Sequence, residues 1–95
     1  TSPNRFSLDT AYPNPFNNSI KIDFTINSFG YVDIGIYDIE GKWILNLIGK
    51  KMQSGKYNIV WKADDKAGME VASGTYLVMM KFGSSIQTKK ITLIK

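Results

Sequence analysis

Few residues in this chain of 95 could perform chemistry. The chain contains no cysteine and no histidine, so a thiolate nucleophile, the most common general base and two frequent metal ligands are missing. Asp33 and Asp38 lie five positions apart, and an odd separation in an ideal strand places their carboxylates on opposite faces. They do not match a glycosidase pair, and we expect neither enzyme activity nor a cofactor.

Two adjacent carboxylates near a glycine could form a calcium loop. Asp64 and Asp65 precede Gly68, and hard cations prefer carboxylate oxygens. The spaced acidic series and the distal glutamate of calcium-binding loops are missing from this segment. A turn in which aspartate caps backbone N–H groups and Gly68 takes a positive φ is the simpler interpretation, and we expect no metal site.

Aromatic rings are the remaining feature that could bind a ligand. Tyr31 and Tyr37 share the outward parity of one predicted strand, and a row of exposed rings can stack on the apolar faces of sugars. A polysaccharide platform at these two tyrosines stands beside the alternative that both rings pack at the boundary of the core. Trp43 and Trp61 share the parity of apolar neighbours, so we expect both in the core.

The charge of the chain is unevenly distributed. The first 47 residues carry three basic and five acidic side chains, whereas the remaining residues carry nine and three, which together give a net charge of +4. All basic residues except Arg5 are lysines, and a lysine offers no bidentate fork to phosphate or guanine. We therefore interpret the lysines as solvated strand faces and guards of sheet edges, and expect no nucleic-acid partner.

Alternating apolar and polar residues predict strands along the whole chain, and no stretch has a helical period. The expected strands are a short one at 6–8 and six long ones at 20–26, 31–37, 43–48, 57–61, 75–82 and 86–94. Residues 50–55 are polar and predict a loop, and the nearly continuous apolar run 75–82 predicts a strand covered on both faces. The expected fold is all-β: an immunoglobulin-like or fibronectin-III-like antiparallel β-sandwich of about seven strands.

The segment 11–19 is dense in proline and asparagine. Pro13 and Pro15 fix φ and remove two backbone donors, so this segment can be neither a helix nor a central strand. We expect a rigid corner in which Tyr12 and Phe16 close one end of the core.

The chain reads as one domain with a short leading segment. Residues 1–5 resemble the end of a linker from an upstream domain, and residues 6–95 form the predicted sandwich. No apolar run approaches the roughly 18 residues of a transmembrane segment, and the first residues lack a secretory signal pattern. The last predicted strand ends almost at Lys95, so a receptor could meet an ordered C-terminal end.

Three motifs in order resemble those of the C-terminal sorting domains of the type IX secretion system. They are Tyr12-Pro13-Asn14-Pro15-Phe16-Asn17, residues 30–42 with their Ile-Tyr-Asp-Ile-Glu-Gly-Lys ending, and residues 55–61 continuing to Lys95. Asn18 stands where the family usually has a proline. The second and third motifs are also similar to the immunoglobulin-like domain of flagellar hook-capping proteins, whereas the proline corner and the ending at Lys95 favour the sorting domain.

The resemblance implies a non-catalytic domain at the end of a larger secreted protein of a Gram-negative bacterium. Such a domain directs its cargo from the periplasm across the outer membrane, for secretion or cell-surface attachment. The implied partners are the secretion and attachment machinery of the outer membrane and the upstream domain of the same precursor. By motif, the export signal would comprise residues of the last strands: Gly74, Tyr76, Lys89, Lys90 and Lys95.

Two other functions remain open. A carbohydrate-binding accessory module of a secreted glycoside hydrolase or other extracellular enzyme would use Tyr31 and Tyr37. A structural accessory module would dock on its parent protein, and an apolar strip at Leu77 and Met79 is a candidate for that contact.

Overall fold

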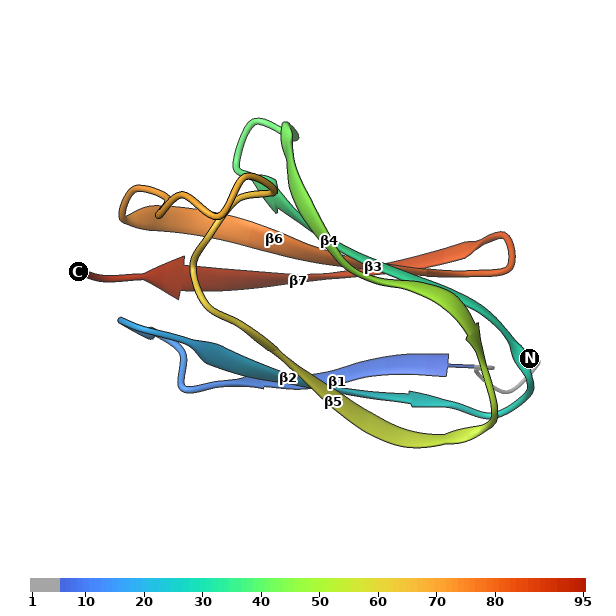
Figure 1. Cartoon of the computed structure of the whole chain (residues 1–95). Coiled ribbons are helices and arrows are strands. Elements are labelled where there is room, and N and C mark those ends of the chain that lie inside the picture. Colours follow the sequence, from blue (N-terminus) through green and yellow to red (C-terminus); the bar gives the residue numbers. More distant parts are fainter. Residues whose placement is uncertain (1–5) are drawn as a thin grey trace.

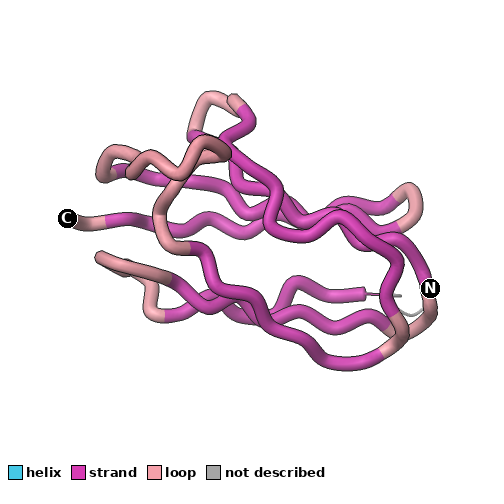
Figure 2. The backbone as a smooth tube through the Cα atoms, in the orientation of Figure 1, coloured by secondary structure: helices cyan, strands magenta, loops and turns pink. Residues whose placement is uncertain are grey.

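The computed structural model describes residues 6–95, and these residues form two antiparallel sheets packed face to face (Figures 1 and 2). The strands are β1 (Phe6–Tyr12), β2 (Ile20–Ile26), β3 (Gly30–Asp38), β4 (Trp43–Met52), β5 (Gly55–Trp61), β6 (Gly74–Phe82) and β7 (Ser85–Leu93). Sheet A has the order β1-β2-β5, and sheet B has the order β4-β3-β6-β7. The predicted all-β, immunoglobulin-like sandwich is confirmed, and the predicted linker at residues 1–5 lies outside the described residues.

Alternation of apolar and polar residues builds the core. In β2 the apolar side chains at every second position are buried, while the polar ones between them are half-buried. The inward side chains of the other strands join those of β2 in one buried cluster between the sheets. The largest fully buried side chain of this cluster is Trp61, at the end of β5. Burial of these apolar faces is the main favourable term in folding the chain.

Strand β4 departs from strict alternation. Its register against β3 shifts twice, so that Leu47 and Ile44 have no direct partner, and each such bulge reverses the parity of the residues beyond it. The prediction that Trp43 lies in the core is therefore wrong, and its side chain is 42% exposed. Its indole N–H donates to Asn46 Oδ1 (2.7 Å), and the Lys66 ammonium lies 4.8 Å from its ring centroid.

Two strand boundaries also differ from the sequence prediction. Strand β1 runs past Leu8 to Tyr12, because a bulge lets its polar second half continue the pairing with β2. Strand β4 runs through Met52, so the predicted loop at 50–55 shrinks to Gln53 and Ser54. Polar residues are compatible with β4 because it is an edge strand with solvent beside it.

Strand β6 is central in sheet B, but only one of its faces is covered by the other sheet. Its inward side chains are buried, whereas Leu77 and Met79 on the outer face are half-buried among neighbouring side chains. The prediction of cover on both faces is therefore wrong, because no second layer lies over the outer face of sheet B within residues 6–95 (Figure 2). Within the same residues, no helix is long and apolar enough to cross a membrane.

Candidate recognition surface at the C-terminal strand

Strand β7 is an edge strand of sheet B and lies beside β1 of sheet A (Figure 1). It pairs with β6 along its whole length, from Ser85 opposite Phe82 to Leu93 opposite Gly74. Its even-numbered residues turn their backbone groups away from β6, toward the free edge of the sheet. The groups that bind this free edge therefore fix the position of the C-terminal residues.

The proline-rich corner binds the free edge of β7. The side-chain amide of Asn14 donates to Lys90 O (3.3 Å), and its Oδ1 accepts from Thr92 N–H (3.0 Å). The Phe16 N–H donates to Thr92 O (2.9 Å), and Phe16 O accepts from Ile94 N–H (2.8 Å). We call residues 13–16 the clasp, because they hold the second half of β7 as a short parallel strand would.

The composition of the clasp explains its conformation. Pro13 and Pro15 carry no N–H, so their backbone nitrogens need no partner on this exposed corner. The Phe16 side chain is buried, and its ring centroid lies 5.7 Å from that of Trp61. The prediction that Phe16 closes one end of the core is therefore confirmed.

Tyr12 behaves differently from Phe16. It is the last residue of β1, pairs with Lys21 of β2 and is exposed, so the prediction that it closes the core is wrong. The Lys21 ammonium lies 5.6 Å from the centroid of the Tyr12 ring. A hydrogen bond to the Tyr12 side chain raises the pKa of the Lys21 ammonium, and the negative charge of the Tyr12 phenolate acts in the same direction.

Gln87 holds the first half of β7 to the opposite sheet. Its Nε2 donates to Phe6 O (3.1 Å), and its Oε1 accepts from Leu8 N–H (2.8 Å). Sequence reasoning missed this residue. The available signal was its parity, because Gln87 is a polar residue on the inward face that Ile91 and Leu93 share.

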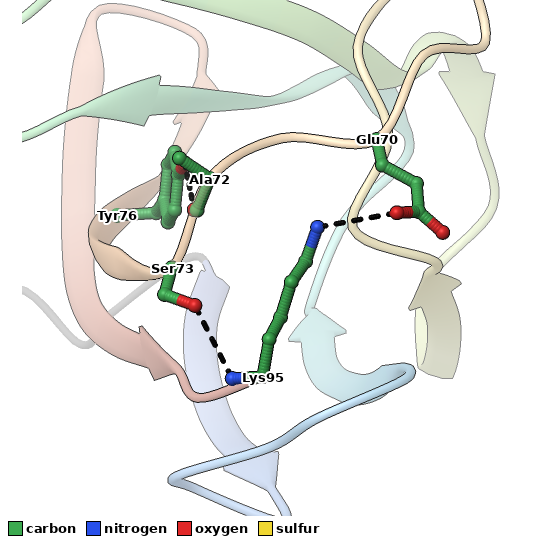
Figure 3. A network of polar contacts seen from close by, with 5 residues as sticks. All are labelled: Glu70, Ala72, Ser73, Tyr76 and Lys95. Carbon is green, nitrogen blue, oxygen red and sulfur yellow. Dashed lines mark hydrogen bonds and ion pairs between the residues drawn. The ribbon is translucent and has the colours of Figure 1, made fainter.

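The C-terminal end is also held by the loop that precedes β6 (Figure 3). The backbone N–H of Lys95 donates to Ser73 Oγ (3.2 Å), and its ammonium lies 3.4 Å from Glu70 Oε1. Tyr76 begins the buried face of β6, and its hydroxyl donates to Ala72 O (2.6 Å). The loop thus connects the last residue of the chain to the core.

The structure brings together some of the predicted export residues and separates others. Gly74, Tyr76 and Lys95 lie at the same end of sheet B, where Gly74 pairs with Leu93 and the Lys95 N–H donates to Ser73. Gly74 has φ +154°, a conformation that residues with a side chain rarely adopt. Lys89 and Lys90 are consecutive in β7 and therefore point to opposite faces, with Lys90 exposed and Lys89 half-buried.

The clasp and the end of the chain form one surface. A shallow depression of about 400 Å³ is lined by Pro13, Pro15, Phe16, Asn17, Ile94 and Lys95. Ile94 is largely exposed at its rim. The surface therefore offers apolar contacts beside a lysine ammonium, and residues from both ends of the sequence supply it.

The acidic loop forms the turn expected from its sequence. Asp65 Oδ1 accepts hydrogen bonds from the N–H groups of Ala67 and Met69, both at 2.9 Å. Gly68 takes φ +85°. The turn interpretation is confirmed, because the carboxylate is used to cap backbone N–H groups.

The two tyrosines of the predicted sugar platform lie on the outer face of β3. Tyr31 is exposed and Tyr37 is half-buried, and six positions of extended chain separate their Cα atoms by about 20 Å. Each lies against a glycine, Tyr31 against Gly49 and Tyr37 against Gly35. Sugar binding at these residues stays a prediction.

The fold resembles parts of several larger solved proteins. Dimeric latent PorU from Porphyromonas gingivalis matches 99% of this chain with a TM-score of 0.77 and 22% identity, over 10% of its own length. PorZ, an essential surface component of the type IX secretion system of the same bacterium, matches 90% with a TM-score of 0.63 and 22% identity, over 11% of its length. FlgD from Xanthomonas campestris, a flagellar hook-capping protein, matches 92% with a TM-score of 0.63 and 19% identity, over 64% of its length.

Comparison with family models identifies the family, whereas comparison with curated protein sequences gives no match. The chain spans about a tenth of PorU and PorZ, and the likeness to them shows a shared fold. The family model described as the secretion system C-terminal sorting domain matches residues 10–95, from the second half of β1 through the clasp to the last residue. The chain belongs to the family of secretion system C-terminal sorting domains.

Proposed function

We propose that this domain is a non-catalytic export signal, and that the type IX secretion machinery recognises the surface of the folded sandwich. Membership of the sorting-domain family supports the secretion role. The observation that carries the proposal is the way the last residues are held: the clasp, β6 and the loop before β6 all bind them. A receptor would thus meet Ile94 and Lys95 in one defined conformation.

The contact surface follows from exposure and charge. Ile94 and the prolines of the clasp supply apolar area, and Lys95 supplies a positive charge. The ion pair of Lys95 with Glu70 is exposed to solvent, and exposed pairs contribute only about 0–1 kcal/mol. A receptor carboxylate can therefore replace Glu70 at little cost.

The other predicted export residues would act in two ways. Gly74 and Tyr76 position the C-terminal end: Gly74 sets the backbone where β6 begins, and Tyr76 anchors the preceding loop to the core. Lys90 lies exposed on the outer face of sheet B, where it would extend the positive surface toward a partner, with Lys89 at the inner edge.

The proposal places the domain downstream of a larger protein, which is its cargo. The solved relatives support this arrangement, because the matching fold is about a tenth of PorU and of PorZ. The cargo would pass through the periplasm of a Gram-negative bacterium and be released or attached at the cell surface. The upstream domain is thus a partner in cis, and Leu77 and Met79 on the outer face of sheet B are its proposed contact.

Export of a periplasmic fluorescent reporter fused to residues 1–95 tests the proposal. The host must carry type IX secretion, and a strain without the translocon is the first control. Ile94→Ser should lower the exported fraction at least about fivefold, because it removes apolar area at the contact surface. Ile86→Ser is the matched control: Ile86 is 56% exposed and Ile94 is 53% exposed, but Ile86 lies at the other end of β7.

Four outcomes decide the result. Translocon-dependent fluorescence in the medium supports secretion, and fluorescence in the outer-membrane fraction supports attachment. A folded reporter that stays in the periplasm contradicts export. Equal export of the two serine variants contradicts the assignment of the contact surface to the C-terminal end.

A further inference from the structure

A second surface feature lies on the outer face of sheet B. It lies beside the hairpin between β6 and β7, at the end of the molecule opposite the C-terminus (Figure 1). It is a hollow of about 330 Å³ where β3 begins and where the hairpin joins β6 to β7. We call it the Tyr31 hollow, and its lining residues are Gly30, Tyr31, Asp33, Lys81, Phe82 and Gly83.

Two glycines, Gly30 and Gly83, line the hollow. The Phe82 ring lies 2.8 Å from the point that a Cβ would occupy at Gly30, so a larger residue at that position would collide with the ring. Gly83 takes φ +63° at the first of the two residues between β6 and β7, which is the glycine position of a type II′ turn. The Phe82 ring is buried (3% exposed) and packs beneath Gly30, so it forms an apolar floor below the hollow.

Tyr31 forms one wall of the hollow. Its hydroxyl oxygen lies 3.1 Å from the point that a Cβ would occupy at Gly49 of the neighbouring strand. The ring thus lies across β4, while 53% of the residue stays exposed. An exposed aromatic ring can bind the apolar face of a sugar, and a tyrosine, with only two rotatable side-chain bonds, loses little entropy when it does so.

A carboxylate and an ammonium group flank the ring. Asp33 and Lys81 are direct partners in the pairing of β3 with β6, yet no ion pair joins their side chains. Asp33 Oδ1 accepts from Asn46 Nδ2 (2.8 Å), and Asn46 Oδ1 in turn accepts from the indole N–H of Trp43 (2.7 Å). This chain of hydrogen bonds orients the Asp33 carboxylate and leaves its Oδ2 available as an acceptor.

We propose that the Tyr31 hollow is a carbohydrate subsite for one neutral pyranose ring of a glycan. The apolar face of the sugar stacks on Tyr31, a hydroxyl group donates to Asp33 Oδ2, and the Lys81 ammonium donates to a hydroxyl oxygen. Sugar hydroxyls suit this pair because each both donates and accepts. One negative and one positive group at the rim cancel, which favours a neutral sugar over an anionic one. Tyr37 lies outside this subsite.

The subsite is separate from the proposed recognition surface at the clasp, Ile94 and Lys95. The two lie at opposite ends of sheet B, so glycan binding leaves the clasp and Lys95 accessible. A domain that stays attached to an exported protein would thereby hold it on a polysaccharide. Failure of export would leave this site untouched, and failure of sugar binding would leave the export proposal untouched.

Amide chemical shifts of the ¹⁵N-labelled chain test the proposal. The probes are short oligomers of glucose, mannose, galactose and N-acetylglucosamine, each raised to about 10 mM so that weak binding is detected. We expect at least one of them to give saturable shifts at Gly30, Tyr31 and Gly83. Tyr31→Ala should weaken that binding about tenfold, and Tyr31→Phe should retain it because the stacking face remains.

Two further variants make the test specific. Phe29→Ala is the matched control, because Phe29 is an aromatic residue of similar exposure (57% against 53% for Tyr31) two positions away and does not line the hollow. Asp33→Asn keeps an acceptor for Asn46 and removes the second carboxylate oxygen, so it should also weaken binding while the fold is retained. The proposal is overturned if no oligomer gives saturable shifts at the hollow, or if Tyr31→Ala and Asp33→Asn both bind like the unmodified chain. Binding of polygalacturonate alone, abolished by salt, also overturns it.

Discussion

Tyr76 joins the candidate recognition surface to the core. Its ring meets the Trp61 ring edge to face with centroids 5.3 Å apart, and its hydroxyl donates to Ala72 O. Burial raises the pKa of the Tyr76 phenol, and the negative charge of Asp38 acts in the same direction. The folded state therefore favours the neutral hydroxyl, the form that donates the hydrogen bond.

The pH dependence of folding tests this role of Tyr76. At neutral pH, Tyr76→Phe should lower the free energy of unfolding by about 1 kcal/mol, the usual value of one hydrogen bond. Because the pKa is raised in the folded state, the unfolded chain loses the phenol proton first once the pH exceeds about 10. The stabilisation by the hydroxyl then decreases as the pH rises through the folded-state pKa. Urea unfolding of both proteins from near pH 8 upward should show a difference that narrows above pH 10, and a constant difference would contradict the assignment.

Strand β7 is held on both of its edges. Strand β6 pairs with one edge over its whole length, while Gln87 and the clasp connect the strand to the other sheet. An edge strand with free backbone groups is open to pairing with another chain. Covering the second half of this edge keeps the last residues in the fold and leaves their side chains exposed.

Asn14 provides a direct test of the clasp. Asn14→Ala removes the two hydrogen bonds of its side chain to β7, and we expect a loss of about 1–2 kcal/mol in unfolding free energy. Amide hydrogen exchange should accelerate at Thr92 and Ile94 more than in β2. Asn18→Ala is the control, since Asn18 is exposed and outside the clasp. Unchanged exchange at Thr92 would show that the clasp does not hold the strand.

On the scale of the whole molecule, three aromatic rings connect the parts. The Trp61 ring of sheet A packs between Phe16 of the clasp and Tyr76 of sheet B, with centroid distances of 5.7 Å and 5.3 Å. Within residues 6–95 no backbone ladder joins the two sheets, so side-chain contacts make them one folding unit. Loss of either sheet would expose the same buried rings.

We therefore expect residues 6–95 to unfold in one cooperative step. In a Trp43→Phe variant, Trp61 is the only remaining tryptophan, and its fluorescence reports on the contact between the sheets. The urea midpoint from fluorescence should equal the midpoint from far-UV circular dichroism. A fluorescence change that precedes the loss of strand signal would contradict a single unit. Trp43→Phe itself should have a small effect, because Trp43 lies on the surface.

Features that depend on neighbouring residues follow from the sequence alone. The alternation in β2 predicts which side chains are buried, and glycines at turns predict where strands end. The proline corner, the Ile-Tyr-Asp strand and the final lysines identify the family because their order and spacing are read along the chain. Phe16 in the core and the capped turn at Asp65 follow from the same local chemistry.

Features that join distant residues follow from the tertiary structure and not from any local pattern. The hydrogen bonds of Asn14 to Thr92 and of Gln87 to Phe6 span 78 and 81 positions, and no local pattern states which strands become neighbours. Alternation predicts the wrong face for Trp43, because a bulge in β4 reverses the face of the residues beyond it. The Tyr31 hollow likewise needs β3, β4 and β6 side by side, since its wall, the glycine beneath that wall and its lysine come from three strands. Parity determines the face on which a side chain lies, whereas pairing and register determine what that side chain meets.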